Sequence, residues 1–269
     1  MKIYFAVTGQ QEPQYLPANG LNKLLCSFHY YKKDEELIKK LIAEGCDLFI
    51  DSGAFSAANA GSKIDIDEYS RFILKTGVKF YAGLDVIGDA VGTKSNQRYM
   101  ESKYSLKPIP TFHMGEPLEF ALEMANEYEY MAVGGMVFSE GIEGWLDNLW
   151  NQLLKVNKDI KCHGFGLTNS KLIEKYPWES VDSSSFKSGK RFGRIILYNA
   201  ARNELVTEDF NNWVDRYADL TRDDQILEDS AFRYMTTDVL SAKAYNRFAD
   251  YLNSKGKDYT HLTSQTTLF

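Results

Sequence analysis

The stretch DLFIDSGA, residues 47–54, is a short apolar run that ends on an aspartate, a serine and a glycine. Its apolar residues are nearly continuous rather than alternating, which is typical of a parallel strand covered on both faces. Runs of the same kind recur at residues 2–9, 79–88, 108–115, 130–136, 160–167, 180–186 and 194–199. The sequence therefore predicts eight strands.

Amphipathic helical patterns separate most of these strands. They cover residues 34–45, 67–77, 116–125 and 144–156, each with apolar residues at helical spacing. Strands that alternate with helices are typical of α/β proteins. We therefore expect a (β/α)8 TIM-type barrel, and the alternative is a doubly wound open sheet.

The end of the chain follows a different pattern. Residues 207–255 have helical spacing without intervening strands, and Thr207 could cap the first of these helices. The sequence shows no internal repeat and no convincing linker. We therefore expect a single domain over residues 1–269, with residues 207–255 as a C-terminal helical extension of the barrel.

Composition narrows the class of protein. The chain is 44% hydrophobic and 25% charged, as in ordinary globular proteins, and its net charge is −6. A protein that merely coats nucleic acid is usually basic, so any contact with a polynucleotide should be local. The three cysteines are too widely spaced for a disulfide framework, no apolar run is long enough to span a membrane, and the first residues are too polar for a signal sequence. We expect a cytoplasmic protein without a membrane partner.

Polar residues gather where the predicted strands end, which is where barrel enzymes place their sites. A lone aspartate at such a point is often a helix cap, but three aspartates at one edge favour a chemical site. The residues concerned are Asp51, Ser52, Gly53, Asp85, His113, Met114, Gly134, Gly135, His163, Gly164 and Asp182. Paired carboxylates beside glycines that admit a flat ligand suit cleavage at an anomeric carbon.

Other chemistries fit the sequence less well. The histidines and aspartates match no metal-ligand spacing, so we expect no metal. No serine lies in a G-x-S-x-G elbow, and the glycine pairs form no nucleotide fingerprint. We therefore expect no cofactor.

A basic stretch follows the predicted seventh strand. Lys187, Lys190, Arg191 and Arg194 come within a dozen residues of Asp182. This segment is either a polar turn or a patch that contacts the phosphates of a nucleic acid.

Six segments, in order between about residues 45 and 195, resemble those of the tRNA-guanine transglycosylases. LFIDSGAFSA is similar to their D-S-G-G-F-Q segment, and YAGLDVIGD to the strand with their base-binding aspartate. PTFHMGE stands where they have a Q-G segment, and YMAVGGMV resembles their A-V-G-G-L turn. CHGFGLTN resembles M-G-V-G-T, and SVDSSSF with its trailing cations resembles D-x-F-D-C.

The resemblance implies a (β/α)8 barrel and a role for each matching residue. Asp182 matches the covalent nucleophile, and Asp51 matches the second catalytic aspartate, a general acid and base. Asp85 matches the carboxylate that reads the guanine edge, while Gly134 and Gly135 match the backbone that meets the base. The remaining residues of the site, Ser52, Gly53, His113, Met114, His163 and Gly164, are expected to line the base pocket.

The chain also departs from that family, because it lacks the C-x-C-x-x-C zinc module and is shorter. It is more similar to the phage- and bacterium-encoded branch that inserts 7-deazaguanines, such as preQ0, into DNA. We therefore expect DNA rather than tRNA as the polymer, in a bacterial or phage-infected cell. Base exchange on a buried nucleotide would require base flipping.

Three alternatives stay open from the sequence. The same site could end the reaction with water, as an N-glycosylase or nucleoside hydrolase does. A catalytically silent nucleic-acid-binding partner subunit could keep most of these segments. The sequence also leaves open whether the chain is a homodimer or pairs with another subunit.

Overall fold

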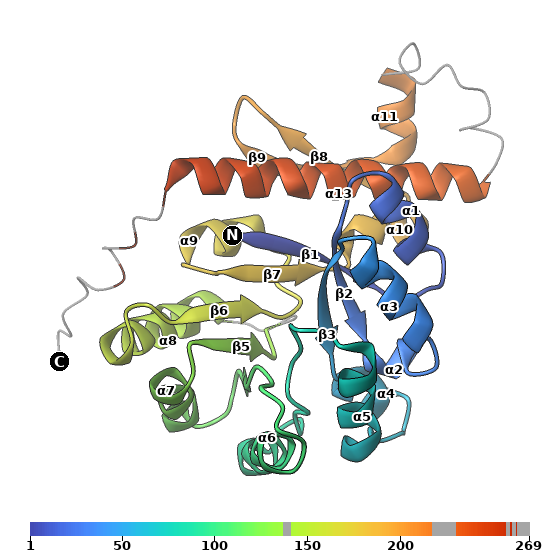
Figure 1. Cartoon of the computed structure of the whole chain (residues 1–269). Coiled ribbons are helices and arrows are strands. Elements are labelled where there is room, and N and C mark those ends of the chain that lie inside the picture. Colours follow the sequence, from blue (N-terminus) through green and yellow to red (C-terminus); the bar gives the residue numbers. More distant parts are fainter. Residues whose placement is uncertain (137–140, 217–229, 257–258, 260–261, 263–269) are drawn as a thin grey trace.

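The computed structural model describes residues 1–269 except 137–140, 217–229, 257–258, 260–261 and 263–269. It is an α/β structure built on a sheet of seven parallel strands, which Figure 1 shows to be curled with helices around it. The strands of this sheet are β1 (Lys2–Val7), β2 (Lys23–Ser27), β3 (Asp47–Asp51), β4 (Thr111–His113), β5 (Tyr130–Gly134), β6 (Lys161–Gly164) and β7 (Ser180–Ser183).

Helices follow most of the strands. Between β1 and β7 these are α1 (Glu12–Ala18), α2 (Phe28–Tyr31), α3 (Glu35–Ala43), α4 (Ala54–Asn59), α5 (Ile66–Thr76), α6 (Ala90–Tyr104), α7 (Leu118–Glu127), α8 (Ile142–Val156) and α9 (Ser170–Lys175). After β7 come a short 3-10 turn, η1 (Ser185–Lys187), and the helices α10 (Ser188–Phe192), α11 (Phe210–Arg216) and α13 (Ser230–Lys255).

The sheet has the order β3-β2-β1-β7-β6-β5-β4, so the first and seventh strands are neighbours at its centre. Its two edge strands are linked through residues 81–82. Tyr81 forms a single parallel bridge with Ile50, and Ala82 forms one with Ile109. The predicted strand at 79–88 is thus reduced to two bridges, whereas β2 is a strand that the sequence analysis did not predict.

The curl of the sheet separates two cores, and β1 shows how the sequence builds them. Successive side chains of a strand point to opposite faces. Tyr4 belongs to an inner cluster within the curl, whereas Ile3 and Phe5 belong to the outer cluster beneath the helices. The inner cluster comprises Tyr4, Leu25, Phe49, Ala82, Ile109 and Ala132. Burial on both faces explains the nearly continuous apolar runs.

Helix α5 illustrates how local signals set an element's limits. The carboxylate of Asp65 accepts a hydrogen bond from the backbone N–H of Glu68 and caps the first turn. The helix ends at Gly77, whose φ of 69° is the left-handed conformation that favours glycine. Its buried face carries Tyr69 and Phe72, as the helical pattern predicted.

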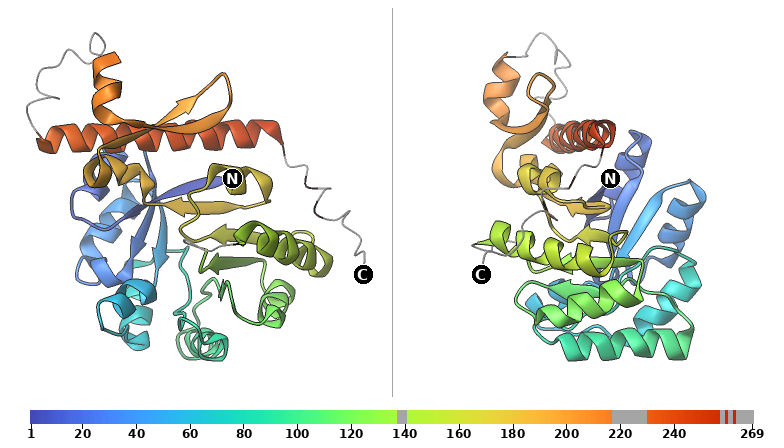
Figure 2. Two further views of the ribbon diagram at one scale, coloured as in Figure 1. Left: turned by 180° about the vertical axis from the view of Figure 1, so that it is seen from behind. Right: turned by 90° about the vertical axis from the view of Figure 1, so that its left-hand side faces the viewer.

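The predicted eighth strand does not join the main sheet. Residues Arg194–Asn199 form β8, which pairs antiparallel with β9 (Glu204–Asp209) in a separate hairpin. The place expected for it is taken, because β1 pairs directly with β7. Figure 2 shows the hairpin on the far side of α13 from the main sheet. An apolar run alone does not specify its partner, and here the turn with Asn203 at a φ of 53° returns the chain antiparallel.

The C-terminal extension is helical only in part. Thr207 lies in β9 and therefore does not cap a helix, because α11 begins at Phe210. Residues 217–229 of the predicted extension lie outside the described residues. Helix α13 contacts β1, η1 and β8, and it buries Ala244 and Phe248. Among the described residues, no helix has the length and apolar character needed to cross a membrane.

We predict that Phe248→Ala lowers the free energy of unfolding of the whole chain by about 3–5 kcal/mol, because it leaves a cavity under α13. Phe248 is 1% exposed, and the nearby, exposed Lys243 provides a matched control in Lys243→Ala. Urea unfolding followed by circular dichroism and tryptophan fluorescence measures the effect. An early, separate transition confined to the helical signal would show that α13 is not part of this cooperative unit.

Candidate active site

Three aspartates meet at the carboxyl edge of the main sheet. Asp51 is the last residue of β3, Asp182 lies in β7, and Asp85 follows the bridged residues 81–82. The negative charges of Asp85 and Asp182 both act on Asp51. The structure thus brings together the three carboxylates that the sequence analysis singled out.

Asp51 is the carboxylate that this environment changes most. Burial raises its pKa, the charges of Asp85 and Asp182 raise it further, and the value reaches about 7. The backbone N–H groups of Ser52 and Gly53 oppose the shift, the latter with a 3.1 Å bond to Oδ2 of Asp51. An acid with a pKa near neutrality can both give and accept a proton, as a general acid–base group must.

Ser52 and Gly53 shape the turn after β3. The hydroxyl of Ser52 donates a 2.8 Å hydrogen bond to Oδ1 of Asp85, which ties two of the carboxylate-bearing segments together. Gly53 has a φ of 78°, and a Cβ there would lie 2.4 Å from Oγ of Ser27 and 2.5 Å from Cβ of His29. Only glycine fits this position, so its role is to let β2 and β3 approach.

His113 forms an ion pair with Asp85. Its Nε2 lies 3.1 Å from Oδ2 of Asp85, and its Nδ1 lies 3.5 Å from Oε1 of Glu116. Burial lowers the pKa of His113, but the hydrogen bonds and charges of the two carboxylates outweigh burial and raise it to about 9. His113 is therefore an imidazolium at neutral pH, with its charge shared between two acids.

The glycine pair at the end of β5 packs against the same region. A Cβ at Gly134 would lie 2.8 Å from Cδ2 of His113, so this glycine lets the imidazole ring lie close to β5. Met114 donates its backbone N–H to the carbonyl of Gly134, and Gly135 has a φ of 75° beside the backbone of Met114. The structure thus places the predicted Gly134, Gly135 and Met114 together with His113.

Asp182 is held through one oxygen. Its Oδ1 accepts a 2.8 Å hydrogen bond from the backbone N–H of Gly166 and a 3.2 Å bond from Nε2 of His163. Nδ1 of His163 lies 2.6 Å from the hydroxyl of Ser180, which lies 2.7 Å from the hydroxyl of Tyr130. If Tyr130 donates to Ser180 and Ser180 to Nδ1, every group in this relay is satisfied and His163 donates to Asp182.

His163 is fully buried in an aromatic cage. Its ring centroid lies 4.5 Å from that of Phe49 and 4.6 Å from that of Phe165. Burial lowers its pKa, although the hydrogen bond to Asp182 opposes this, so the ring is neutral at physiological pH. His163 therefore orients Asp182 from behind, which corrects its expected place in the lining of the base pocket.

Gly164 lies close to the outer core. A Cβ at Gly164 would lie 3.3 Å from the ring of Trp178, a residue of the outer core. This glycine therefore lets β6 pack closely against the helical layer, and its place in the base pocket stays a prediction.

The four predicted phosphate-binding cations do not share one environment. Lys187 is only 6% exposed, its Nζ donates to Oγ1 of Thr8 at 3.0 Å, and it lies 3.5 Å from Oε1 of Glu12. This burial lowers its pKa and corrects its assignment to a surface patch. Arg191 and Arg194 are exposed, as predicted, and the side chain of Lys190 lies outside the described part of the chain.

Sequence reasoning missed four residues of the site. Glu116, Gly166, Ser180 and Tyr130 hold the chemical groups in place without being conspicuous in the sequence. Glu116 did carry a signal, because it follows His113 by three residues in a tight turn. The partnership of Tyr130 and Ser180 joins strands 50 residues apart, which no local pattern shows.

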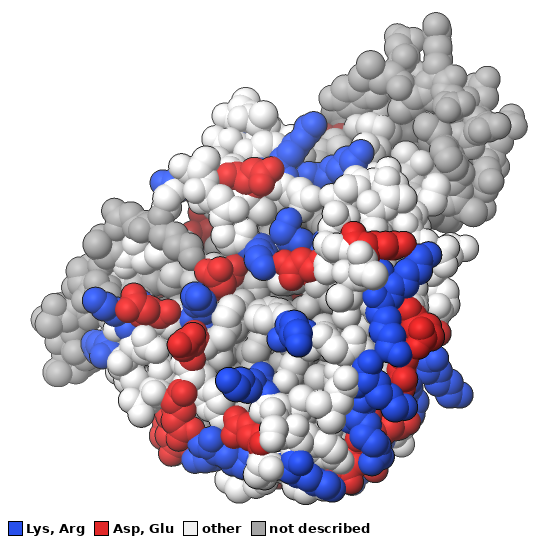
Figure 3. Space-filling model, in the orientation of Figure 1, with Lys and Arg blue, Asp and Glu red and all other residues white. Residues whose placement is uncertain are grey.

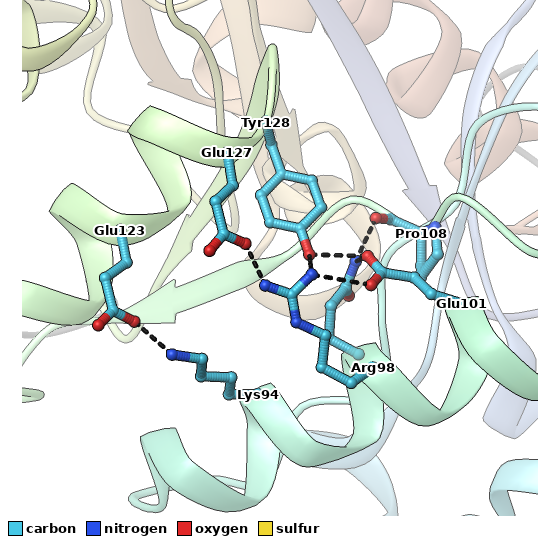
Figure 4. A network of polar contacts seen from close by, with 8 residues as sticks. Lys94, Arg98, Glu101, Pro108, Glu123, Glu127 and Tyr128 are labelled. Carbon is cyan, nitrogen blue, oxygen red and sulfur yellow. Dashed lines mark hydrogen bonds and ion pairs between the residues drawn. The ribbon is translucent and has the colours of Figure 1, made fainter.

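Two cavities lie away from these carboxylates. A small one of about 20 Å³ lies between α6 and α7, where Lys94, Arg98 and neighbouring acids form the network of Figure 4. An open depression of about 460 Å³ lies between α9 and the end of α13. Within the described ranges, no group of three or more histidine, cysteine or acidic residues is arranged to hold a metal ion.

No protein-family model matches the chain, and a search of curated proteins returns no match.

We predict that Asp51→Asn stabilises the protein at high pH. Between the ordinary pKa of 3.8 and the raised value of about 7, folded Asp51 keeps a proton that the unfolded chain has released. Stability therefore falls as the pH rises through this window, by on the order of a few kcal/mol. The amide resembles the protonated acid and avoids this loss.

Thermal unfolding of the variant and of the wild type at about pH 4 and at about pH 8 tests this pH dependence of stability. The gain of the variant over the wild type should be several degrees larger at the higher pH, with the exposed Asp159→Asn as a control for removing one charge. A gain that is the same at both pH values would contradict the raised pKa of Asp51.

Proposed function

We propose that this chain is a transglycosylase that exchanges guanine in a polynucleotide, DNA in preference to tRNA, for a 7-deazaguanine base such as preQ0. The observation that carries this proposal is the pairing of Asp182, which the described residues anchor through Oδ1, with Asp51, whose pKa is about 7. A fixed carboxylate beside a carboxyl group that is poised to transfer protons suits two successive displacements at an anomeric carbon.

The same proposal extends to the fold. The two single bridges of residues 81–82 lie where an eighth strand would close the curled sheet. We propose that the sheet is a (β/α)8 barrel of the kind expected from the resemblance to tRNA-guanine transglycosylases, with residues 81–82 in place of a full strand. The candidate site then lies at the mouth, where barrel enzymes carry theirs.

In the first displacement, Oδ2 of Asp182 attacks C1′ of the target nucleotide. Within the part of the chain that the structure describes, the hydrogen bonds to this carboxylate end on Oδ1, and the proposal therefore assigns the attack to the other oxygen. The C1′–N9 bond breaks, and its electron pair leaves with guanine. Protonated Asp51 supplies the proton that neutralises the departing base. The product is a covalent ester between Asp182 and the sugar.

In the second displacement, the incoming 7-deazaguanine gives its N9 proton to ionised Asp51. Its N9 then attacks C1′, the ester bond breaks, and the electron pair returns to the carboxylate of Asp182. Asp51 ends the cycle protonated and Asp182 ionised, as both began. Two inversions retain the configuration at C1′, and no redox or energy-supplying cofactor enters the balance.

Base selection falls to Asp85 and His113. Asp85 already contacts Ser52 and His113, which fix its orientation. A guanine-like edge offers an N–H and an amine to a carboxylate, and a neighbouring carbonyl to a donor. The imidazolium of His113 is a donor beside Asp85 that could meet this carbonyl.

We predict that Asp182→Asn abolishes exchange while the protein keeps its fold, because an amide is a far weaker nucleophile than a carboxylate. Incubation of the enzyme and DNA with a radiolabelled 7-deazaguanine base measures label retained in the polymer. The wild type should also form a protein–DNA adduct that resists denaturation, and the variant should not. Asp159→Asn is the matched control on the surface.

Each other outcome of this experiment overturns part of the proposal. Equal adduct formation by the Asn variant would remove Asp182 as the nucleophile. Abasic sites in the DNA without retained label would show a hydrolytic glycosylase instead. Incorporation into tRNA but not DNA would correct the polymer. Neither adduct, label nor abasic site with the wild type would leave a non-catalytic binding subunit.

We also predict that Asp85→Ala weakens binding of the free base by one to several decades, because donors of the base then lose buried partners worth roughly 1–3 kcal/mol each. Titration calorimetry with the 7-deazaguanine base measures this affinity. Binding of DNA should change little, since Asp85 does not face the phosphates in this proposal. Unchanged affinity for the base would remove Asp85 from the base pocket.

A further inference from the structure

Large apolar side chains are exposed at one edge of the main sheet. Phe192 is 70% exposed, Phe55 66% and Tyr30 43%, and each lies on a helix directly after the carboxyl end of a strand. We call this set the apolar rim: Tyr30, Phe55, Val86, Ile87, Val91 and Phe192. Single exposed apolar residues are ordinary on protein surfaces, but six gathered on segments that follow strand ends call for a partner.

The rim follows neighbouring strands rather than scattered ones. Phe192 follows β7, Tyr30 follows β2, Phe55 follows β3, and the valine and isoleucine members follow the bridged residues 81–82. In the sheet, β7, β1, β2 and β3 lie side by side. The rim therefore runs along one arc of the edge that also carries Asp182, Asp51 and Asp85.

Hydrogen bonds join the strand ends along this arc. Buried Lys187, just before α10, bonds to Thr8 after β1. The hydroxyl of Tyr31 in α2 donates a 2.5 Å bond to the carbonyl of Gly9, which links the ends of β1 and β2. Helices α2 and α4 contact each other, as Figure 1 shows. Lys187 therefore connects the chain after β7 to the chain after β1, next to the rim, instead of binding phosphate.

Cations without an acidic partner stand beside the rim. Arg191 and Arg194 flank Phe192, Lys33 follows Tyr30 by three residues, and all three are exposed. Within the described part of the chain, no ion pair involves any of them. The basic residues of α6 differ, because Lys94 and Arg98 bind acids of α7 (Figure 4).

The distribution of charge over a whole face of the protein also bears on how it could bind a polyanion. Figure 3 shows basic and acidic side chains interspersed on the face seen there, rather than a broad basic area. A surface of that kind does not attract a polyanion along its whole extent. Any attraction of a polynucleotide to this chain should therefore be local, as at the exposed cations next to the aromatic rings of the rim.

We propose that the apolar rim stacks on the unpaired bases of a single DNA strand that flanks the target nucleotide, while Arg191 and Arg194 contact its phosphates. The inference rests on the proposed function and deepens it, because it assigns the state of the polymer. Aromatic rings alternating with cations are how proteins hold single strands without reading their sequence.

Two other occupants fit the rim less well. In a duplex the bases are stacked on each other, so exposed rings would find no base face, and phosphates would approach the acidic centre. A second copy of the chain, docked face to face through the rim, would oppose two sets of carboxylates. A single strand instead offers neutral bases to the centre and phosphates to the cations at its margin.

The test compares two fluorescent strands of about 20 nucleotides, a thymidylate strand and a strand of abasic sites with the same number of phosphates. Fluorescence anisotropy measures their binding to the wild type, to Phe55→Ala/Phe192→Ala and to Arg191→Ser/Arg194→Ser. The control is Leu74→Ala/Val156→Ala, which removes exposed apolar side chains that follow no strand end. A matched duplex and a uridylate RNA strand complete the set.

The wild type should bind the thymidylate strand about tenfold or more tightly than the abasic strand, since each stacked base adds a several-fold gain. The phenylalanine pair should lose most of this difference and keep its affinity for the abasic strand. The arginine pair should weaken both strands and reduce the salt slope by roughly 1.4. The control pair should behave as the wild type.

Equal binding of the two strands by the wild type, or equal weakening of both by the phenylalanine pair, would overturn the proposal. Tighter binding of the duplex or of the RNA would show that the rim binds that polymer instead. A dimer of the wild type in sedimentation velocity that is lost in Phe55→Ala/Phe192→Ala would show that the rim binds a second copy of the chain. None of these measurements requires turnover. A protein that exchanges guanine but fails them keeps the proposed function and loses only the role of the rim.

Discussion

Three carboxylates that are buried or half-buried at one edge of a sheet cannot all be ionised without compensation, because burial penalises each charge and proximity adds their repulsion. The structure compensates each one differently. Asp51 keeps its proton up to about pH 7, Asp85 pairs with the imidazolium of His113, and Asp182 accepts from Gly166 and from neutral His163. Many of the residues around the site serve to maintain these three arrangements.

The differences between the carboxylates separate their chemical capacities. A carboxyl group that titrates near neutrality transfers protons, whereas one held ionised by a counter-charge binds donors. Asp182 differs from both in its partners, which are a backbone N–H and a neutral ring rather than a full positive charge. Hydrogen bonds of this strength orient a carboxylate without quenching it as an ion pair would. The two histidines are therefore not interchangeable: burial keeps His163 neutral, and two acids keep His113 charged.

Sequence patterns identified the α/β class and most strands because a strand covered on both faces must be apolar throughout. The patterns failed for one short strand and for one apolar run that does not join the main sheet. The sequence analysis predicts no strand at β2, and residues 194–199 are equally apolar but form a hairpin that packs on α13. Pairing partners depend on contacts distant in the chain, and a local pattern does not contain them.

The candidate site shows the same division. The aspartates could be found from the sequence because a charged residue directly after a buried run is conspicuous. The groups that position them could not, since Tyr130, Ser180 and Gly166 are ordinary constituents of strands and turns. Lys187 misled for a related reason. Its basic neighbours suggested a surface patch, yet the position faces Thr8 and Glu12.

The placement of Lys187 connects the buried chemistry to the exposed rim. A lysine is seldom buried unless it is paired, and this one, in η1, spans from the end of β7 to the end of β1 beside Glu12. Its burial lets the following helix α10 turn outward with Arg191 and Phe192 exposed. The edge of the sheet thus has two zones, an acidic centre whose charges are compensated internally and a margin whose aromatic rings and cations are not. The proposed occupant, an unpaired polynucleotide strand, would offer its uncharged flat bases to the centre and its anionic backbone to the margin.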